Sequence, residues 1–515
     1  MSNSINTLEK AKQAVNALVN YAYNKLGMPD VDLIYAKNAL LDILKIAEPS
    51  DITDPSEDIY YLLDNICAYA LEQGLITKDE EINFQTRIVG AITPPPSSVI
   101  EEFENIAYKE GNMEAAKWLY DFGWKTTYMR KPDIDKNIMW NCEGKYGKID
   151  ITINLSKPEK TPEQIAKAKL AQSGYPKCML CIENVGFVGN AARPARQTLR
   201  TIPIELGGEE WNFQFSPYNY FQEHLIAFAT EHRPMKISRD TFVRMADFVD
   251  IFEDYFIGSN ADLPIVGGSI LAHDHYQGGA KVLPIFSRGS RRNFFYIGYP
   301  NVNVSIVDWY NSVVRIESKI KSQVIEVAET FRKAWENYSD EAVGILANTN
   351  GEPHNTITPI MCMNNGEYRL DLILRNNRTD KEHPYGIYHP TEDMHNIKKE
   401  GIGIIEATGR FILPGRLESE MKMIKDLLTS ADPIPFKELS DEKHPLHKHL
   451  AMIAQLAMDA GTNIHESKAG NAITQYINKT CEKILNTTAV FKNDDVGQEH
   501  FGYFIESVVG KQTQE

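Results

Sequence analysis

The chain has 515 residues, 43% of them hydrophobic, with a formal net charge of −16 at pH 7 and a pI of about 5.4. This length suggests about three domain-sized units, and the acidic balance argues against non-specific binding to nucleic acid or to an anionic membrane. Six sparse cysteines and the lack of an 18-residue apolar run predict a cytoplasmic protein with reduced thiols. An anionic substrate would then require a local group of arginines.

The first part of the chain, residues 1–135, is predicted to be a helical extension. Between Leu8 and Ala22, apolar side chains recur at spacings of three and four, and the same pattern continues from Ile34 to Ile46. No catalytic motif occurs here. From Asn137 to Leu155 the pattern changes to β-branched and aromatic residues around two glycines, which predicts a hairpin.

A pair of cysteines, Cys178 and Cys181, follows the hairpin. Two thiolates three residues apart on a turn can hold one zinc ion if two more nitrogen or sulfur ligands come from elsewhere. A redox pair and a chance spacing remain open on this motif alone.

Three arginines come next, at positions 193, 196 and 200. Their spacing places them on one face if the segment is helical. Guanidinium groups suit phosphates, because they donate two parallel hydrogen bonds. We therefore regard Arg193 and Arg196 as candidates for contact with a substrate phosphate, with a solvated basic face as the alternative.

The next elements are predicted as two strands, Trp211–Phe215 and His224–Phe228, on either side of a turn at 216–220. An amphipathic helix over 240–257 follows, and its aromatic stripe is typical of a core. It leads directly to the most informative stretch of the chain.

That stretch runs from Gly267 to Gly279 and holds His273, His275 and Gln277 at alternate positions between two glycine pairs. If the backbone is extended, these three side chains share one face and the residues between them point to the other. The glycines allow a ligand to approach the backbone closely. A polar edge strand with surface histidines is the alternative.

The remainder of the chain is predicted as a long amphipathic helix over 305–337, an alternating strand over 367–375, and mostly helix from Leu417 onward.

The sequence His273-Asp-His275-Tyr-Gln277 resembles the His-x-His-x-Gln signature of the galactose-1-phosphate uridylyltransferases, a branch of the histidine-triad superfamily, with Asp274 in place of the usual proline. The length and the helical extensions resemble the bacterial class II form. The resemblance implies that His275 is the nucleophile that carries a uridylyl group. It also implies that Gln277 binds the phosphate of the nucleotide.

The resemblance further implies a structural zinc site with four protein ligands, Cys178, Cys181, His232 and His273. It implies no second metal, because Arg369 and Asp371 occupy the strand where class I histidines are expected and only His354 is available. Substrate contacts are expected from Arg193, Arg196, Asn219, Ser269 and Lys399.

The fold expected from the resemblance is α+β, with a duplicated core of two antiparallel half-barrels. The halves would span 136–300 and 301–420, with helical regions at 1–135 and 421–515. The expected activity is uridylyl transfer from UDP-glucose to galactose 1-phosphate by a homodimer. The alternatives are a dinucleoside or ADP-sugar phosphorylase of the same fold, or a zinc-dependent nucleotide-binding protein without activity.

Overall fold

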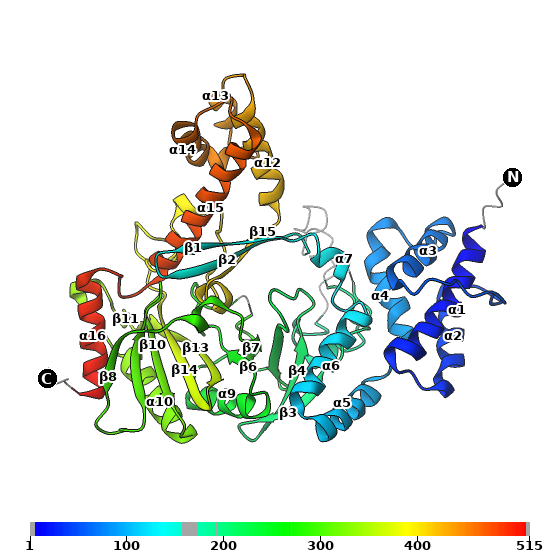
Figure 1. Cartoon of the computed structure of the whole chain (residues 1–515), viewed down its shortest axis with the longest axis horizontal. Coiled ribbons are helices and arrows are strands. Elements are labelled where there is room, and N and C mark those ends of the chain that lie inside the picture. Colours follow the sequence, from blue (N-terminus) through cyan, green and yellow to red (C-terminus); the bar gives the residue numbers. More distant parts are fainter. Residues whose placement is uncertain (1–5, 157–173, 191–192, 269, 511–515) are drawn as a thin grey trace.

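The structure is a computed structural model that describes residues 6–156, 174–190, 193–268 and 270–510. It is a mixed α+β molecule built on one large antiparallel sheet, as the sequence predicts in outline (Figure 1).

The N-terminal part is helical, which confirms the prediction for this region. Helix α1 begins after Asn6, whose side chain accepts a hydrogen bond from the Glu9 amide, and it ends at Gly27 with a φ of 69°. In Figure 1, α1 to α4 lie at one end of the molecule, and α5 and α6 lie nearer to the sheet. The helices are α1 Thr7–Leu26, α2 Asp30–Leu44, α3 Ile59–Glu72, α4 Glu81–Ile92, α5 Pro96–Glu110, α6 Asn112–Lys125 and α7 Lys131–Ile134.

The main sheet has ten strands in the order β3-β4-β5-β7-β6-β13-β14-β10-β9-β8. Five strands from the first part of the chain form one side and five from the second part form the other, joined where β6 pairs with β13. The strands are β3 Ile202–Leu206, β4 Glu209–Phe215, β5 Leu225–Ala229, β6 Tyr255–Gly258, β7 His275–Ala280, β8 Ser290–Phe295, β9 Asn303–Val307, β10 Val313–Ser318, β13 Asn355–Asn364 and β14 Glu367–Asn376. A separate short pair is formed by β11 Asn348–Thr349 and β12 Glu352–Pro353.

Each face of this sheet packs against a different layer. Helices α9 (Arg239–Ile251) and α10 (Lys321–Glu336) share one hydrophobic cluster with one face. The other face packs against a three-stranded sheet of β1 (Ile138–Gly144), β2 (Gly147–Asn154) and β15 (Arg410–Pro414). Strand β15 pairs with β2 in parallel. The faces alternate along each strand, as expected for a sheet buried on both sides.

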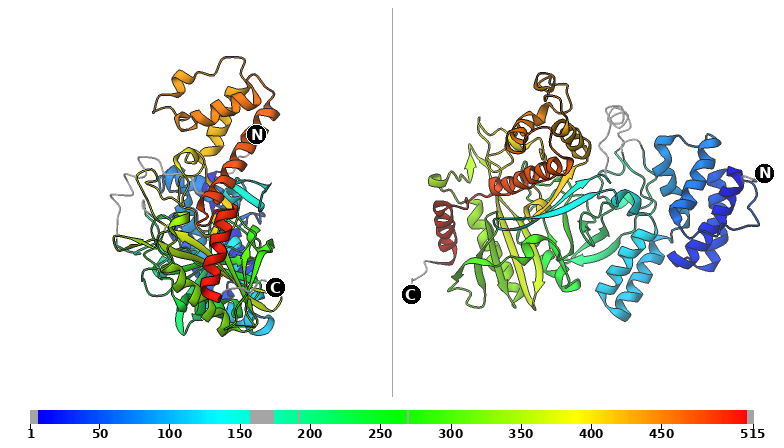
Figure 2. Two further views of the ribbon diagram at one scale, coloured as in Figure 1. Left: turned by 90° about the vertical axis from the view of Figure 1, so that its left-hand side faces the viewer. Right: turned by 45° about the horizontal axis from the view of Figure 1, so that its top comes forward.

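The C-terminal region is mostly helical, as predicted. Figures 1 and 2 show α12 to α15 standing out from the small sheet, whereas α16 packs beside β8. The helices are α11 Ile404–Ala407, α12 Arg416–Thr429, α13 Phe436–Leu439, α14 Leu450–Ala460, α15 Glu466–Thr488 and α16 Asp495–Val509. Within the described residues, no helix combines the length and the apolar character needed to span a membrane.

Two helix predictions are wrong in part. The segment 305–337 contains strands β9 and β10 before α10 begins at Lys321, because the β-branched residues that read as a helical stripe alternate between the faces of the sheet. The helix predicted over 240–257 ends at Ile251, and its last residues form β6.

Candidate functional site

Strand β7 occupies an interior position in the sheet, between β5 and β6. On one face, Tyr276 stacks on Trp211 at a centroid distance of 4.8 Å, and Asp274 lies beside Arg233. His275 and Gln277 therefore face the other way, as the alternation predicts. The strand itself begins at His275, so His273 precedes it.

His275 is buried, and its Nδ1 lies 2.8 Å from the carbonyl oxygen of His273. A carbonyl only accepts, so Nδ1 carries the proton and Nε2 keeps its lone pair. Burial lowers the pKa of His275 to about 4, which makes the ring neutral near pH 7. The imidazole is therefore held in the form of a nitrogen nucleophile.

Oε1 of Gln277 lies 3.1 Å from Nε2 of His224. His224 is buried, and burial lowers its pKa to about 4. Its neutral ring donates from Nε2 to the amide oxygen of Gln277, which directs the amide NH₂ group away from His224. That NH₂ group can then donate to a ligand on this face of the sheet.

Four side chains form a cluster that can hold a metal ion: Cys178, Cys181, His232 and His273, with all ligand atoms within 4.8 Å of one another. Nδ1 of His273 lies 3.1 Å from the sulfur of Cys178, and Nδ1 of His232 lies 3.1 Å from that of Cys181. It is the one such cluster among the residues that the structure describes. The four predicted ligands, spread over nearly a hundred residues, are thus brought together.

The surroundings of the cluster orient its ligands. His273 donates from Nε2 to the carbonyl of Ala229 at 2.8 Å, so Nδ1 presents its lone pair to the thiols. The Asn184 amide donates to the carbonyls of Cys178 and Cys181, both at 2.8 Å, and so fixes the turn between them.

The segment that carries the arginines is not a helix in the described residues, so they do not share a helical face. Arg193 donates to the Lys177 carbonyl at 3.1 Å, and Arg196 lies over the Tyr128 ring. Arg200 is buried against the start of α5, where it donates to the carbonyls of Thr93 and Pro94.

The remaining predicted contacts lie in loops. Asn219 has a φ of 42° in the turn before β5, and its Oδ1 accepts a hydrogen bond from Tyr120 of α6 at 3.1 Å. Lys399 is exposed beside the Tyr385 ring. His354, the second-half histidine, uses both ring nitrogens in hydrogen bonds to Asn377 and Thr349. Ser269 lies outside the described residues.

Sequence reasoning missed two residues on the face of the sheet that carries His275 and Gln277. His224 was assigned only to a strand, although a histidine at the head of an apolar run is a signal for a buried polar contact. Asn260 follows β6 and accepts a hydrogen bond from the Ile404 amide at 2.9 Å. A Cβ at Gly268 would lie 2.7 Å from the Asn260 Nδ2, so this glycine allows the close approach.

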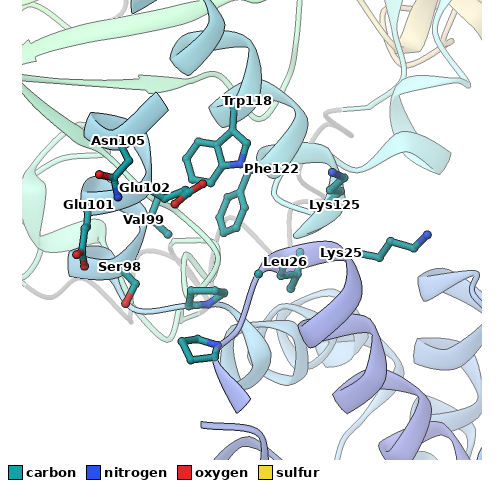
Figure 3. Close-up of a pocket in the computed structure, with 13 residues that line it drawn as sticks. Lys25, Leu26, Ser98, Val99, Glu101, Glu102, Asn105, Trp118, Phe122 and Lys125 are labelled. Atoms are coloured by element: carbon teal, nitrogen blue, oxygen red, sulfur yellow. The ribbon is translucent and has the colours of Figure 1, made fainter. Parts of the chain in front are cut away.

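A pocket of about 410 Å³ lies elsewhere, where α1, α5 and α6 meet (Figure 3). Its lining includes none of the predicted site residues. The lysines of the lining, Lys25 and Lys125, form ion pairs with Glu57 and Asp121. The pocket is therefore separate from the cluster around His275.

Comparisons with known proteins agree with this site. Residues 38–234 match the model of the galactose-1-phosphate uridyl transferase N-terminal domain. The galactose-1-phosphate uridylyltransferase of Caldanaerobacter subterraneus subsp. tengcongensis is 43% identical, with 97% of this chain and 98% of that protein aligned. That of Fusobacterium nucleatum is 42% identical over 96% of this chain and 99% of that protein. The enzyme of Clostridium acetobutylicum is 44% identical, with 95% of this chain and 98% of that protein aligned.

Among solved structures, the yeast Ap4A phosphorylase Apa2 gives a TM-score of 0.31 at 10% identity, covering 64% of this chain and 89% of that chain. The sequence relatives align along nearly their whole length, through the Cys178 turn and strand β7. The chain belongs to the galactose-1-phosphate uridylyltransferase family.

Proposed function

We propose that this protein transfers a uridylyl group from UDP-glucose to galactose 1-phosphate through a covalent intermediate on His275. The observation that carries the proposal is the hydrogen bond from Nδ1 of His275 to the His273 carbonyl, which leaves Nε2 as a free nucleophile. The names of the relatives supply the substrates.

In the first step, Nε2 of His275 forms a bond to the α-phosphorus of UDP-glucose. The bond from that phosphorus to the bridging oxygen breaks, and glucose 1-phosphate leaves with the electron pair. In the second step, a phosphate oxygen of galactose 1-phosphate attacks the uridylyl-histidine, which releases UDP-galactose and restores the imidazole. The acceptor is already an anion, so no general base is needed.

Gln277 is the proposed donor to a non-bridging oxygen of the α-phosphate. Its amide is oriented by His224 so that the NH₂ group faces the sheet side shared with His275. Charge builds on that oxygen in the transition state, and a donor fixed in advance stabilises it. We propose further substrate contacts from Arg193, Arg196, Asn219, Ser269 and Lys399, on the family resemblance alone.

The metal is proposed to be one structural zinc ion. Zinc bonds of about 2.3 Å to sulfur and 2.0–2.1 Å to nitrogen place tetrahedral ligand atoms roughly 3.3–3.8 Å apart. Four of the separations between the ligand atoms are 3.1 to 3.8 Å and all lie within 4.8 Å, so small shifts of the side chains would bring the set to this geometry. The ion would stabilise the fold and hold His273, whose carbonyl orients His275. We propose no second metal.

We also propose that the main sheet is a duplication. In the chain, three strands, a helix and two strands occur twice, and both sets have the same order in the sheet, β3-β4-β5-β7-β6 and β8-β9-β10-β14-β13. This supports two halves, although β8 (Ser290–Phe295) belongs to the second set and so moves the boundary to before residue 290, from the 136–300 and 301–420 expected from the sequence. Helical regions are proposed at 1–135 and 421–515. A homodimer is proposed by analogy with the family.

The test is a burst experiment. Enzyme mixed with UDP-glucose alone should release about one equivalent of glucose 1-phosphate per active site and then stop, because His275 stays uridylylated. Galactose 1-phosphate should then discharge the intermediate as UDP-galactose. Faster discharge by inorganic phosphate would identify a phosphorylase instead. No release would identify a binding protein.

A further inference from the structure

Four arginines of the described residues are buried: Arg200, Arg244, Arg315 and Arg375. Arg244 pairs with Glu209, and the guanidinium groups of Arg315 and Arg200 are satisfied. Arg315, 2% exposed, makes two parallel hydrogen bonds to Asp371, at 2.7 and 2.8 Å. Arg200, 8% exposed, has no carboxylate but donates five hydrogen bonds to main-chain carbonyls. These two arginines show how this fold compensates a buried cation.

Arg375 is different. It is 1% exposed, and its Nη2 donates a hydrogen bond to the Ile402 carbonyl at 2.8 Å. Its Nη1 is buried without a partner, and no carboxylate of the described residues forms an ion pair with it. Burial lowers its pKa to about 10. The charge of Glu406 raises this pKa without forming an ion pair with Arg375, so the buried cation is only partly compensated and its free Nη1 hydrogen bond suits an anion.

The sheet register places Arg375 on the same face as the nucleophile. Gln277 pairs with Gly258, Gly258 with Ile360, and Ile360 with Asp371. Arg375 lies four residues beyond Asp371, an even number, and so shares that face. Three strand spacings and two residue rises separate it from His275, a Cα distance of roughly 16 Å, which the imidazole, the arginine side chain and the two phosphates of a UDP-sugar between them would span.

A loop segment joins the two positions. The Ile404 amide donates to Asn260, which follows β6 next to His275, and the Ile402 carbonyl accepts from Arg375. A second buried side chain nearby has one ring nitrogen without a partner, Nδ1 of His389. Burial, and to a smaller degree the charge of Arg375, lower the pKa of His389 to about 4, so its ring is neutral and adds no second cation beside Arg375.

We propose that Arg375, with His389 beside it, forms a phosphate subsite that binds the phosphate group of the hexose 1-phosphate. The inference rests on the proposed function for the identity of the hexose phosphate. The same subsite would serve the leaving glucose 1-phosphate and the incoming galactose 1-phosphate, because both carry a phosphate monoester at the same position. The phosphate dianion would pair with the guanidinium and accept the free Nη1 hydrogen bond.

The experiment compares Arg375→Met with the wild-type chain by calorimetric titration of galactose 1-phosphate and, separately, of UMP. We expect affinity for galactose 1-phosphate to fall about 10- to 100-fold, since a charge-assisted hydrogen bond is lost. Affinity for UMP should change less than threefold. The melting temperature without ligand should stay the same or rise, because the variant removes a buried charge that has no ion-pair partner.

Arg200→Met is the matched control. It also removes a buried arginine, but one that is fully hydrogen-bonded, so the melting temperature should fall while affinity for galactose 1-phosphate is retained. Arg375→Lys should recover part of the affinity. Unchanged affinity in Arg375→Met overturns the proposal, and so does an equal loss for UMP or a fall in melting temperature as large as that of Arg200→Met.

The binding readout does not require turnover, so the two proposals can fail separately. If the wild-type chain gives no burst with UDP-glucose yet binds galactose 1-phosphate through Arg375, the uridylyl-transfer proposal fails and the phosphate subsite stands.

Discussion

The two halves of the main sheet have the same strand order, but they differ in whether their polar side chains have hydrogen-bonding partners within the protein. On one face of the first half, His275 has a free Nε2 and Gln277 an amide directed away from its partner. On the same face of the second half, Arg369 pairs with Glu317 at 2.8 Å and Arg315 with Asp371. The groups of these two ion pairs of the second half satisfy one another, with Nη1 of Arg375 as the exception, whereas the polar groups of His275 and Gln277 in the first half are left available to a ligand. The comparison teaches that site chemistry here depends on which polar groups lack internal partners.

The largest effect on activity is expected when the nucleophile of the first half is removed. His275→Ala should lower uridylyl transfer by several orders of magnitude and abolish the burst, because Nε2 of His275 is the proposed nucleophile. Initial rates and glucose 1-phosphate release measure the effect. His354→Ala, which alters a hydrogen-bonded histidine of the second half, should retain activity within a few fold. Activity of His275→Ala within tenfold of wild type would exclude the assignment.

The metal cluster lies in the first half. Its loss should mainly lower the thermal stability of the protein. Cys181→Ser should reduce bound zinc from about one ion per chain to well below stoichiometry, and lower the melting temperature more than it alters the rate of the chemical step. Elemental analysis and thermal unfolding measure both. A fully active, fully stable protein without metal would mean that the cysteines simply pack in the core.

Mutation of the buried ion pair between Arg315 and Asp371 in the second half should lower the stability of the fold. Arg315→Met should cost about 3–5 kcal/mol in the free energy of unfolding, because it leaves the Asp371 carboxylate buried without a partner. The double variant Arg315→Met/Asp371→Leu should recover most of that loss. Urea unfolding gives the free energies. If the single variant is as stable as wild type, the ion pair does not compensate a buried charge.

The smallest effect expected is the coupling between His224 and Gln277. Gln277→Ala should lower transfer on the order of 10²-fold, since it removes one donor to developing charge. His224→Phe alone should cost about tenfold, but close to nothing further when Gln277 is already alanine. His449→Phe, a buried histidine of the C-terminal region, is the control and should be additive. Additive losses for His224 and Gln277 would show that His224 does not act through the amide.

Much of this arrangement was accessible from the sequence, for identifiable physical reasons. The alternation in His273 to Gln277 predicts a shared face because a strand has a period of two. The helix boundaries near 251 and 321 were wrong because Val and Ile satisfy a helical stripe and a buried strand equally well over short runs. The contact between His224 and Gln277 depends on the pairing of β5 with β7. The position of Arg375 likewise depends on the pairing of β14 with its neighbouring strands. No local pattern contains that information.

The parallel pairing of β2 with β15 has a consequence for biosynthesis. Asp150 and Arg410 form an ion pair across it although 260 positions separate them in the chain. Translation at about 5–20 residues per second takes roughly 13–50 s to cover that distance. During this time the hairpin of β1 and β2 has been made, but the open edge of β2 has no native neighbour. An unpaired strand edge is a template for pairing with other chains. Nascent chains of this protein are therefore most exposed to aggregation between the synthesis of the hairpin and that of β15, which is the interval in which a chaperone would protect them.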